Sequence, residues 1–314
     1  MLLKFFSKIK LFLTNSYTKI FLLFNSFLLL FIFFISWAYS NLNLNLKLEN
    51  KQILVYQQSN YYYFPSFQEK KDFNSQERFV FSIKVLNTIN QDKQNDIYNC
   101  QYTIDTFVSK NFSQDQLNLI NSFLLKGFKV LFYLKSNYDL LYSPEIIYFY
   151  KDLPDYEANK NVVDYIKNSD YFFNIVKNSI NWMKPLESGE IISEYGESYI
   201  KFNAKLNYYF VGPKKLNLSK NLSNVNVLLY QANGKLLNVE SNLDLFKDLK
   251  LMDSNLKFFE YYEVNTNIPI LLQREINMKF DIEDFNLKQK FFQKTGKTYL
   301  EFNFLITLML VKKK

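Results

Sequence analysis

The chain contains few side chains that could carry out chemistry. It has no histidine and a single cysteine, Cys100. The lack of histidine excludes Ser-His-Asp and Cys-His catalytic arrangements, His-ligated zinc and haem, and the usual general base near neutral pH. One cysteine can form neither an intrachain disulfide nor a multi-cysteine metal site. We therefore expect Cys100 to be a small buried residue of the core or of a sheet.

The segment Thr295-Gly-Lys-Thr298 matches the last residues of a phosphate-binding Walker A loop. That loop needs a glycine five positions before its Gly-Lys pair, where this chain has Phe291. It also needs a helix directly after it, so that the helix N-terminus faces the phosphates. The residues after Thr298 have the composition of a strand instead. We predict a hairpin turn here and no nucleotide site.

Two groups of carboxylates could hold a hard cation such as calcium or magnesium. The first has spacings of three, four and three, which would place its members on one face of a continuous helix: Glu187, Glu190, Glu194 and Glu197. Gly189 and Gly196 disfavour such a helix. The second group is Asp281, Glu283 and Asp284. We predict solvated acidic segments, with a cation site as the alternative. A glycosidase needs only two carboxylates, but no pair stands out.

The formal net charge of +8 is concentrated at the two ends of the chain. Four lysines precede residue 20 with no acidic residue among them, and three end the chain: Lys4, Lys8, Lys10, Lys19, Lys312, Lys313 and Lys314. Without these seven charges the net charge of +8 falls to +1. Phosphate binding requires a broad basic surface, so we do not expect a nucleic-acid partner.

Residues 20–39 form a run without charged side chains that is rich in phenylalanine and leucine. As a helix the run would be about 30 Å long, the thickness of a bilayer's hydrocarbon core. Trp37 and Tyr39 suit the membrane interface at one end. The lysines before the run predict that the N-terminus stays on the side of synthesis. We predict a retained membrane anchor; a signal peptide, cleaved near Ala38-Tyr-Ser40, is the alternative.

The part after residue 40 shows both strand and helix signals. Alternation and short apolar runs predict strands at residues 42–48, 53–56, 78–86, 98–104 and 128–134. Ser113 and Gln116 have capping-box spacing, and Gly127 ends the helix that they begin. This helix and its two flanking strands would form a βαβ unit. Residues 155–184 are predicted to form two further helices.

From residue 188 the sequence is β-rich. Strands are expected at residues 198–210, 225–230, 235–239, 258–264, 270–280 and 298–311. Asn233-Gly234 is a strong hairpin signal between two of them. We thus predict an α+β protein with a single N-terminal transmembrane helix, a mixed α/β body and a β-rich C-terminal half. Its regions are an anchor at 1–40, an α/β region at 41–187, and a β-rich region with a basic tail at 188–314.

Aromatic residues are unusually frequent, with 33 phenylalanines and 24 tyrosines. They cluster at residues 61–64, 148–150 and 258–262. Large aromatic side chains fill cores and are enriched at interface hot spots. We expect these clusters to pack in the core, with part of the aromatic surface buried against partners.

The phenylalanine-rich span at residues 20–39, the basic start before it and the Asn-, Tyr- and Lys-rich body resemble orphan membrane proteins encoded in ciliate mitochondrial genomes. The resemblance implies a non-catalytic accessory subunit of a respiratory-chain complex in the mitochondrial inner membrane, with cytochrome c oxidase slightly favoured. The body would lie in the intermembrane space and contact other subunits and the bilayer. A mitoribosomal protein and a membrane-anchored surface protein or hydrolase are the alternatives. We expect no catalytic residue, cofactor or metal.

Overall fold

The computed structural model describes residues 44–64, 73–89, 96–110, 113–142, 144–148, 160, 164, 170–184, 189–195, 198–218, 222–241 and 248–314. The contacts divide the chain into two units, Met1–Asn43 and Leu44–Lys314. The predicted anchor at residues 20–39 lies outside the described residues. Among the helices that are described, none combines the length and the apolar character that crossing a bilayer requires.

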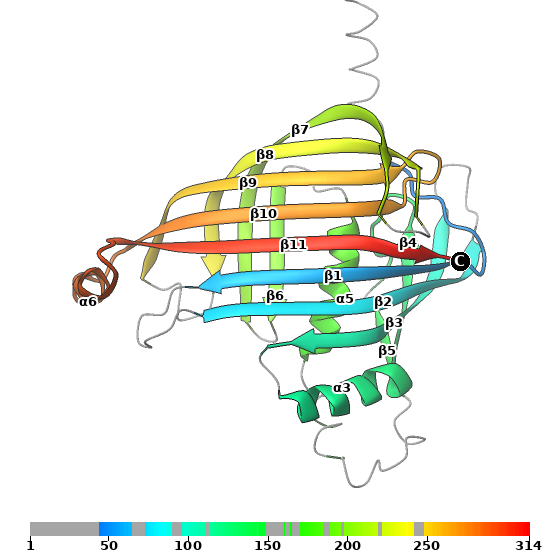
Figure 1. Ribbon diagram of the computed structural model, residues 1–314, viewed down its shortest axis with the longest axis horizontal. Coiled ribbons are helices and arrows are strands. Elements are labelled where there is room, and N and C mark those ends of the chain that lie inside the picture. The colour runs from blue at the N-terminus through cyan, green and yellow to red at the C-terminus, as the bar shows by residue number, and fades with distance from the viewer. Residues whose placement is uncertain are drawn as a thin grey trace, which may run out of the picture. The chain divides into compact units, whose positions relative to one another are not determined.

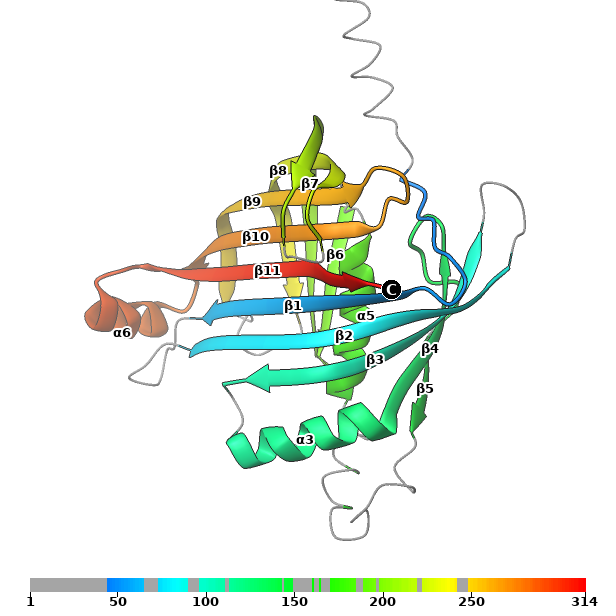
Figure 2. The same ribbon diagram turned by 45° about the vertical axis from the view of Figure 1, so that its right-hand side comes forward.

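The unit from Leu44 to Lys314 is built on one eleven-stranded sheet (Figures 1 and 2). Its strands are β1 (Ile53–Phe64), β2 (Phe73–Ile89), β3 (Ile97–Ser109), β4 (Phe128–Lys135), β5 (Glu145–Tyr148), β6 (Gly189–Tyr195), β7 (Ser198–Leu216), β8 (Val225–Ser241), β9 (Leu249–Glu263), β10 (Pro269–Ile282) and β11 (Tyr299–Lys313). Its helices are α3 (Gln114–Gly127), α5 (Asp170–Met183) and α6 (Phe285–Thr295).

Every neighbouring pair of strands in the sheet is antiparallel. The strand order is β5-β4-β3-β2-β1-β11-β10-β9-β8-β7-β6. The first and last strands therefore pair in the middle of the sheet, and all other pairs are between strands consecutive in the chain. Such an order is typical of a meander whose two ends have come together.

The predicted α+β fold is wrong, because the body is dominated by this one antiparallel sheet. The expected βαβ unit requires parallel strands, but β3 and β4 pair antiparallel, with Ile97 opposite Lys135. Helix α3 therefore lies within the connection of two neighbouring antiparallel strands. The strands from both predicted regions belong to the same sheet.

Many local predictions are confirmed. The predicted strands at 78–86, 98–104, 128–134, 198–210, 270–280 and 298–311 lie almost entirely within β2, β3, β4, β7, β10 and β11. The helix expected after Ser113 is α3, and both bonds of its capping box are present: Gln116 N donates to Ser113 Oγ at 3.3 Å and Ser113 N to Gln116 Oε1 at 2.8 Å. Helix α5 corresponds to the second helix expected in 155–184.

The predicted strand at 42–48 is wrong for the described part, which has no strand geometry. Its alternation still has a physical cause, because Leu46 and Leu48 are buried in the core. The backbone bonds go elsewhere: Leu46 N donates to Ser136 O at 2.7 Å and Lys47 N to Thr266 O at 2.8 Å. The segment thus packs against the end of the sheet without forming a strand of it.

The two faces of the sheet differ sharply in burial. Along β10 and along β11 up to Leu310 the even-numbered side chains are buried, and most odd-numbered ones are partly or fully exposed. The buried side chains form an inner face with two apolar clusters. One joins β1–β4 and one end of β8–β11 to α3 and α5, and the other joins the far ends of β7–β11 to α6. In Figure 1 helix α5 lies behind the sheet, so the viewer sees the outer face.

Stacked aromatic rings connect the central strands on the inner face. Tyr56 of β1 stacks on Phe81 of β2 with ring centroids 5.5 Å apart, and Phe81 stacks on Tyr102 of β3 at 4.7 Å. Tyr56 and Phe81 are direct cross-strand partners, which is the arrangement that stabilises neighbouring strands. The abundance of aromatic residues therefore serves the core of the sheet in part.

The hairpin predicted at Asn233-Gly234 is wrong, since β8 runs through both residues. Gly234 is required there for a different reason. A Cβ atom on it would lie 2.3 Å from the carbonyl oxygen of Lys205 and 2.9 Å from a methyl group of Leu206. The glycine thus permits a close approach of β7 and β8.

We predict that Gly234→Ala destabilises the protein by about 1–3 kcal/mol, because the added methyl group must push two strands apart. In an unconstrained strand the same change would be stabilising. The free energy of unfolding from urea titration measures the effect. Asn226→Ala, at an exposed position of the same strand, is the control and should change it by less than about 0.5 kcal/mol. Equal values for the two variants would contradict the prediction.

Candidate functional site

The Walker-like segment is the end of a helix. Gly296 caps α6 in the left-handed conformation, with φ of 72°, and its N–H donates to Phe292 O at 2.7 Å. Phe291, at the position where a phosphate loop needs glycine, is buried in the apolar cluster. β11 begins at Tyr299, directly after the segment. The expected absence of a helix after it is confirmed, but the expected hairpin turn is a helix-to-strand connection.

Two members of the predicted carboxylate series, Glu190 and Glu194, belong to β6, a strand. They are four residues apart along that strand, which is about 13 Å between their backbone positions. The helix that would place them on one face is therefore not formed at these two residues. The other two members, Glu187 and Glu197, lie outside the described residues.

Two members of the second acidic group, Asp281 and Asp284, have structural partners. Asp281 forms an ion pair with Lys288 at 2.6 Å, and its hydrogen bond to Lys288 lowers its pKa. Asp284 caps α6, with its Oδ1 accepting from Leu287 N at 2.7 Å. Within the described residues no three His, Cys, Asp or Glu side chains are grouped as metal ligands would be.

Cys100 lies in β3 and is completely buried. Burial raises the pKa of its thiol to about 12. The thiol therefore stays protonated, and the thiolate that reacts as a nucleophile does not form near neutral pH. The prediction of a buried sheet residue is confirmed.

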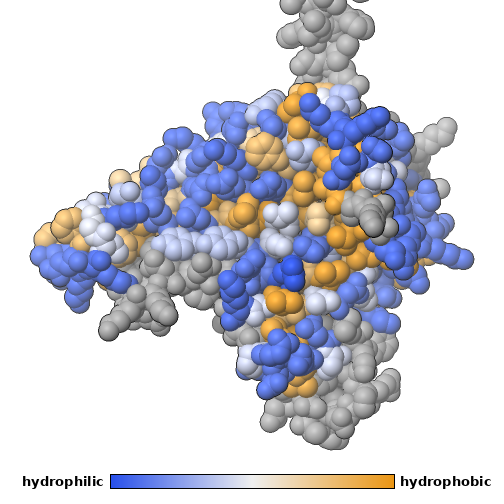
Figure 3. Space-filling view, in the orientation of Figure 1, coloured by the Kyte–Doolittle hydropathy of each residue, from blue (hydrophilic) through white to orange (hydrophobic). Residues whose placement is uncertain are grey.

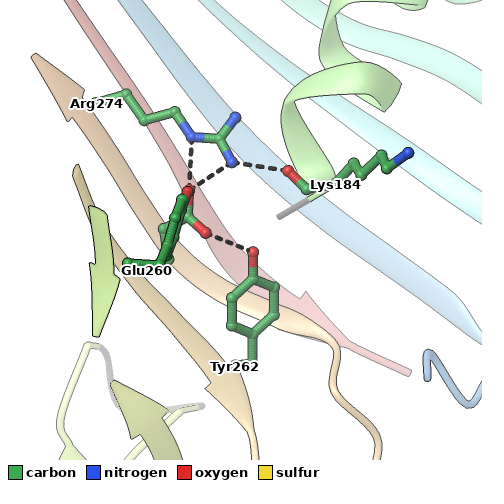
Figure 4. A network of polar contacts seen from close by, with 5 residues as sticks. Lys184, Glu260, Tyr262 and Arg274 are labelled. Atoms are coloured by element: carbon green, nitrogen blue, oxygen red, sulfur yellow. Dashed lines mark hydrogen bonds and ion pairs between the residues drawn. The ribbon is translucent and has the colours of Figure 1, made fainter. Parts of the chain in front are cut away.

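The site that stands out in the structure is a buried ion pair on the inner face, between Arg274 of β10 and Glu260 of β9. Only 1% of the Arg274 side chain and none of the Glu260 side chain is exposed. Arg274 Nε and Nη2 donate to Glu260 Oε1 at 2.9 and 2.7 Å (Figure 4). The strand register explains the contact, because Glu260 stands opposite Leu272, two residues from Arg274.

Two tyrosine hydroxyl groups also donate hydrogen bonds to the Glu260 carboxylate. Tyr208 OH donates to Glu260 Oε1 at 3.0 Å, and Tyr262 OH donates to Oε2 at 2.9 Å. Burial alone would lower the pKa of Arg274, but the adjacent Glu260 outweighs it and the pKa is raised above the ordinary value. Burial and the Glu260 charge raise the pKa of Tyr262. The guanidinium thus stays charged and the phenol neutral.

The same guanidinium holds the end of helix α5. Arg274 Nη2 also donates to the backbone carbonyl of Lys184, directly after α5, at 2.8 Å (Figure 4). A cation at the C-terminal end of a helix is favourable, since unsatisfied carbonyl groups point there. The Lys184 ammonium pairs with Asp139 at 2.6 Å. The backbone carbonyl of Lys184 therefore connects the end of α5 to the sheet, and its ammonium group connects it to the turn after β4.

Helix α5 covers the inner face beside this site. Val176, Ile180 and Met183 are buried in the apolar cluster. Ser179 is also fully buried, and its hydroxyl donates to Ile175 O at 2.6 Å. This buried hydroxyl of α5 is therefore satisfied within the helix itself.

Aromatic rings enclose the ion pair on the side that faces the end of the sheet. Tyr138 and Tyr230 make edge contacts with Tyr262 at centroid distances of 6.3 and 6.1 Å. The hydroxyl of Tyr138 donates to Asn267 O across the end of the sheet. The carboxylate and guanidinium are thus enclosed by rings and by α5. The arrangement can hold a helix in a fixed position, and it presents neither an activated nucleophile nor an accessible base.

No sequence motif contains Arg274 or Glu260. Arg78 and Arg274 are nevertheless the only arginines in a lysine-rich chain. Arg274 also occupies an alternate position of its strand at which the neighbouring members, Leu272 and Ile276, are apolar. Arginine is preferred over lysine for buried ion pairs because its planar guanidinium offers several directed donors. Glu260 is the one charged residue in the aromatic run at 258–262.

Comparisons with known proteins give little further information. No family model matches the sequence, and no curated protein matches it. A solved structure described as lipid–protein interactions in lipovitellin aligns with a TM-score of 0.39 and 11% sequence identity. The alignment covers 85% of this chain and 26% of the lipovitellin chain. A TM-score this low carries no argument about fold or function.

We predict that Arg274→Met destabilises the protein by about 3–5 kcal/mol, because it leaves the Glu260 charge buried without its cation. The double variant Arg274→Met/Glu260→Leu should recover most of this loss, since it removes both charges. Urea unfolding gives the free energies.

Lys235→Ala is the matched control, because it removes an ion pair with Asp253 of similar length, 2.8 Å, whose partners are mainly exposed. It should cost less than about 1 kcal/mol. A loss for Arg274→Met no greater than that of the control would contradict the structural role of the buried pair.

We also predict that the thiol of Cys100 does not react with maleimide in the folded protein at neutral pH and reacts fully in denaturant. The reason is its complete burial and a pKa raised to about 12. Mass spectrometry of the labelled chain measures the modification. Tyr142→Cys, at a position that is 66% exposed, is the control and should be labelled in the folded state. Rapid labelling of wild-type protein would show that the sheet opens at β3.

Proposed function

We propose that this protein is a non-catalytic accessory subunit of a membrane-bound multi-subunit complex, which it stabilises through protein–protein contacts. The observation that carries the proposal is an apolar surface on the outer face of the sheet. The inner face is covered by α5 and holds a fixed ion pair, so the outer face is the part of the sheet open to a partner.

The apolar surface lies at the end of the sheet where β11 finishes. We call it the outer patch and define it by five partly exposed side chains: Val55, Leu271, Leu305, Met309 and Val311. Leu271 and Met309 are cross-strand partners in β10 and β11. Figure 3 shows apolar side chains gathered on this face, over the middle strands of the sheet and toward this end. Partly exposed apolar side chains gathered on one surface in this way are a feature of interaction sites.

Lysines border the outer patch. Lys312 is the cross-strand neighbour of Val55, and Lys84 is that of Ile53, two residues from Val55 in β1. All three lysines of the border, Lys84, Lys312 and Lys314, are exposed. The proximity of Lys314 lowers the pKa of Lys312, as expected where positive charges stand together. A fitting partner would have an apolar centre and acidic side chains around it.

Several features favour a structural role over catalysis. The thiol is buried and protonated, the acidic residues of the described part have structural partners or lie apart, and the chain has no histidine. The resemblance of the sequence to ciliate mitochondrial membrane proteins favours a respiratory-chain complex of the inner membrane, with a position in the intermembrane space. Cytochrome c oxidase is the first candidate within that group.

The proposal predicts that the protein migrates with a large complex when membranes are gently solubilised and separated by native electrophoresis. Mass spectrometry of the band identifies the neighbouring subunits. We expect subunits of a respiratory complex, those of cytochrome c oxidase first. Migration as a lone chain, or sedimentation with ribosomal RNA, would overturn the proposal.

The outer patch predicts which substitutions release the protein from that complex. Leu271→Glu and Met309→Glu place a charge in the centre of the proposed interface, and each should reduce comigration by at least about tenfold. The matched control is Gln273→Glu, which adds the same charge at an exposed position two residues along β10. Loss of comigration with the control but not with the two patch variants would place the interface elsewhere.

A further inference from the structure

Helix α6 projects from the sheet at the opposite end from the outer patch. It connects β10 to β11 and extends beyond the edge of the strands in both views (Figures 1 and 2). Asp284 caps its N-terminus and Gly296 its C-terminus. The ends of the helix are thus fixed by local hydrogen bonds, and its orientation is fixed by the side chains that it buries.

One face of α6 packs on its own sheet. Phe291 is 4% exposed and belongs to the apolar cluster at this end of the sheet, and Leu287 packs against the same cluster. Lys288 pairs with Asp281 at the end of β10. These contacts determine which residues of the helix point away from the protein.

The outward face of α6 is unusual for a helix facing water. Phe285 is 75% exposed and Phe292 is 51% exposed. The two are seven residues apart, nearly two full turns, so they lie on the same face of the helix. A helix on the surface of a water-soluble domain normally has polar residues there. Met252 in β9, at the same end of the sheet, is also exposed at 61%.

The helix is also basic. Between Phe285 and Thr295 it has three lysines and no acidic residue: Lys288, which pairs with Asp281, and Lys290 and Lys294. Lys290 and Lys294 are exposed. The carboxylate of the N-cap residue, Asp284, accepts a hydrogen bond from Leu287 N. A short basic helix with exposed aromatic side chains is the pattern of helices that lie in the interface of a membrane.

We propose that α6 binds the surface of an anionic lipid bilayer. Phe285 and Phe292 enter the boundary between headgroups and acyl chains, where aromatic side chains are favoured. Lys290 and Lys294 lie at the level of the lipid phosphates and carboxylates, and each lysine adds to the attraction. The inference rests on α6 and its surroundings and does not depend on the identity of the proposed complex.

A protein groove with acidic walls fits α6 less well. Helices that bind in grooves present anchors at i, i+3 or i+4, and i+7. Between Phe285 and Phe292 those positions hold Lys288 and Gln289, and the remaining apolar side chains of the helix face its own sheet. Two aromatic side chains offer little area for a stable protein interface, whereas a bilayer accepts a shallow insertion.

The test places a polarity-sensitive fluorophore at position 292 of the full chain by Phe292→Cys. The buried thiol of Cys100, whose pKa is raised to about 12, keeps the native cysteine unlabelled. The labelled protein is mixed with vesicles of phosphatidylcholine, or of phosphatidylcholine with anionic phosphatidylglycerol, some carrying nitroxide lipids as quenchers. We expect a blue shift and quenching with anionic vesicles, both weakened by salt. The readout is local, so lipid binding by other parts of the chain does not produce it.

Two variants make the test specific. Lys290→Glu/Lys294→Glu in the labelled protein should weaken the response at least about tenfold. Both residue types are good helix formers, and an unchanged circular dichroism spectrum checks that the helix is intact. A probe at Tyr142→Cys, on an exposed turn after β4, should not respond.

Three results would overturn the proposal. The first is an unchanged spectrum of the probe at 292 with anionic vesicles. The second is an equal response at position 142, which would indicate general adsorption. The third is a response to the isolated complex in detergent but not to lipid, which would assign α6 to an acidic protein groove. Comigration on native gels is measured separately, so failure of either proposal leaves the other testable.

Discussion

The pairing of β1 with β11 is the constraint on which the described body depends. It runs from Leu54 opposite Lys313 to Tyr63 opposite Asn303, and it joins the two ends of a meander of more than two hundred residues. Closing a loop of that length costs about 5 kcal/mol in chain entropy beyond a constant. The cost is offset by the backbone hydrogen bonds of the pair and by the burial of Tyr56, Leu308 and Leu310. Without the pairing the sheet would separate into two smaller sheets, each with an exposed edge.

The buried ion pair lies close to this seam. Ile306 of β11 stands between Asn60 of β1 and Arg274 of β10 in the register. An apolar helix on an apolar sheet has no strong preference for one position along it, because apolar contacts are not directional. The hydrogen bond from Arg274 to Lys184 O supplies a direction and fixes the end of α5. In a buried site such a pair adds little net stability, so we assign it the role of positioning the helix.

The outer patch and helix α6 lie at opposite ends of β11. The outer patch includes Met309 and Val311 near its end, and α6 immediately precedes its start. A strand of 15 residues spans about 50 Å. A subunit with this geometry can contact a protein neighbour at one end and a lipid surface at the other at the same time, which is a useful arrangement for a protein at the border of a membrane complex.

The sequence by itself determined the local elements and the exclusions. Period-two alternation identified the strands at 98–104, 270–280 and 298–311, and the Ser113 capping box located α3, because these signals depend on neighbours a few residues away. The missing histidine and the single Cys100 likewise removed whole classes of chemistry. Arg274 was visible only as a rare residue type, and its partner Glu260 could not be named, because cross-strand contacts depend on register.

Only the tertiary structure decided how the strands combine. An apolar strand on each side of a helix is compatible with either parallel or antiparallel pairing, and the antiparallel register of β3 and β4 turned a predicted βαβ unit into part of one meander. Gly234 suggested a turn, yet its role is a 2.3 Å approach to a neighbouring strand that no local pattern reveals. Direction, register and close approach are long-range properties of the backbone, whereas alternation and capping are short-range, and this is why most of the strands and helix α3 were predicted and the sheet was not.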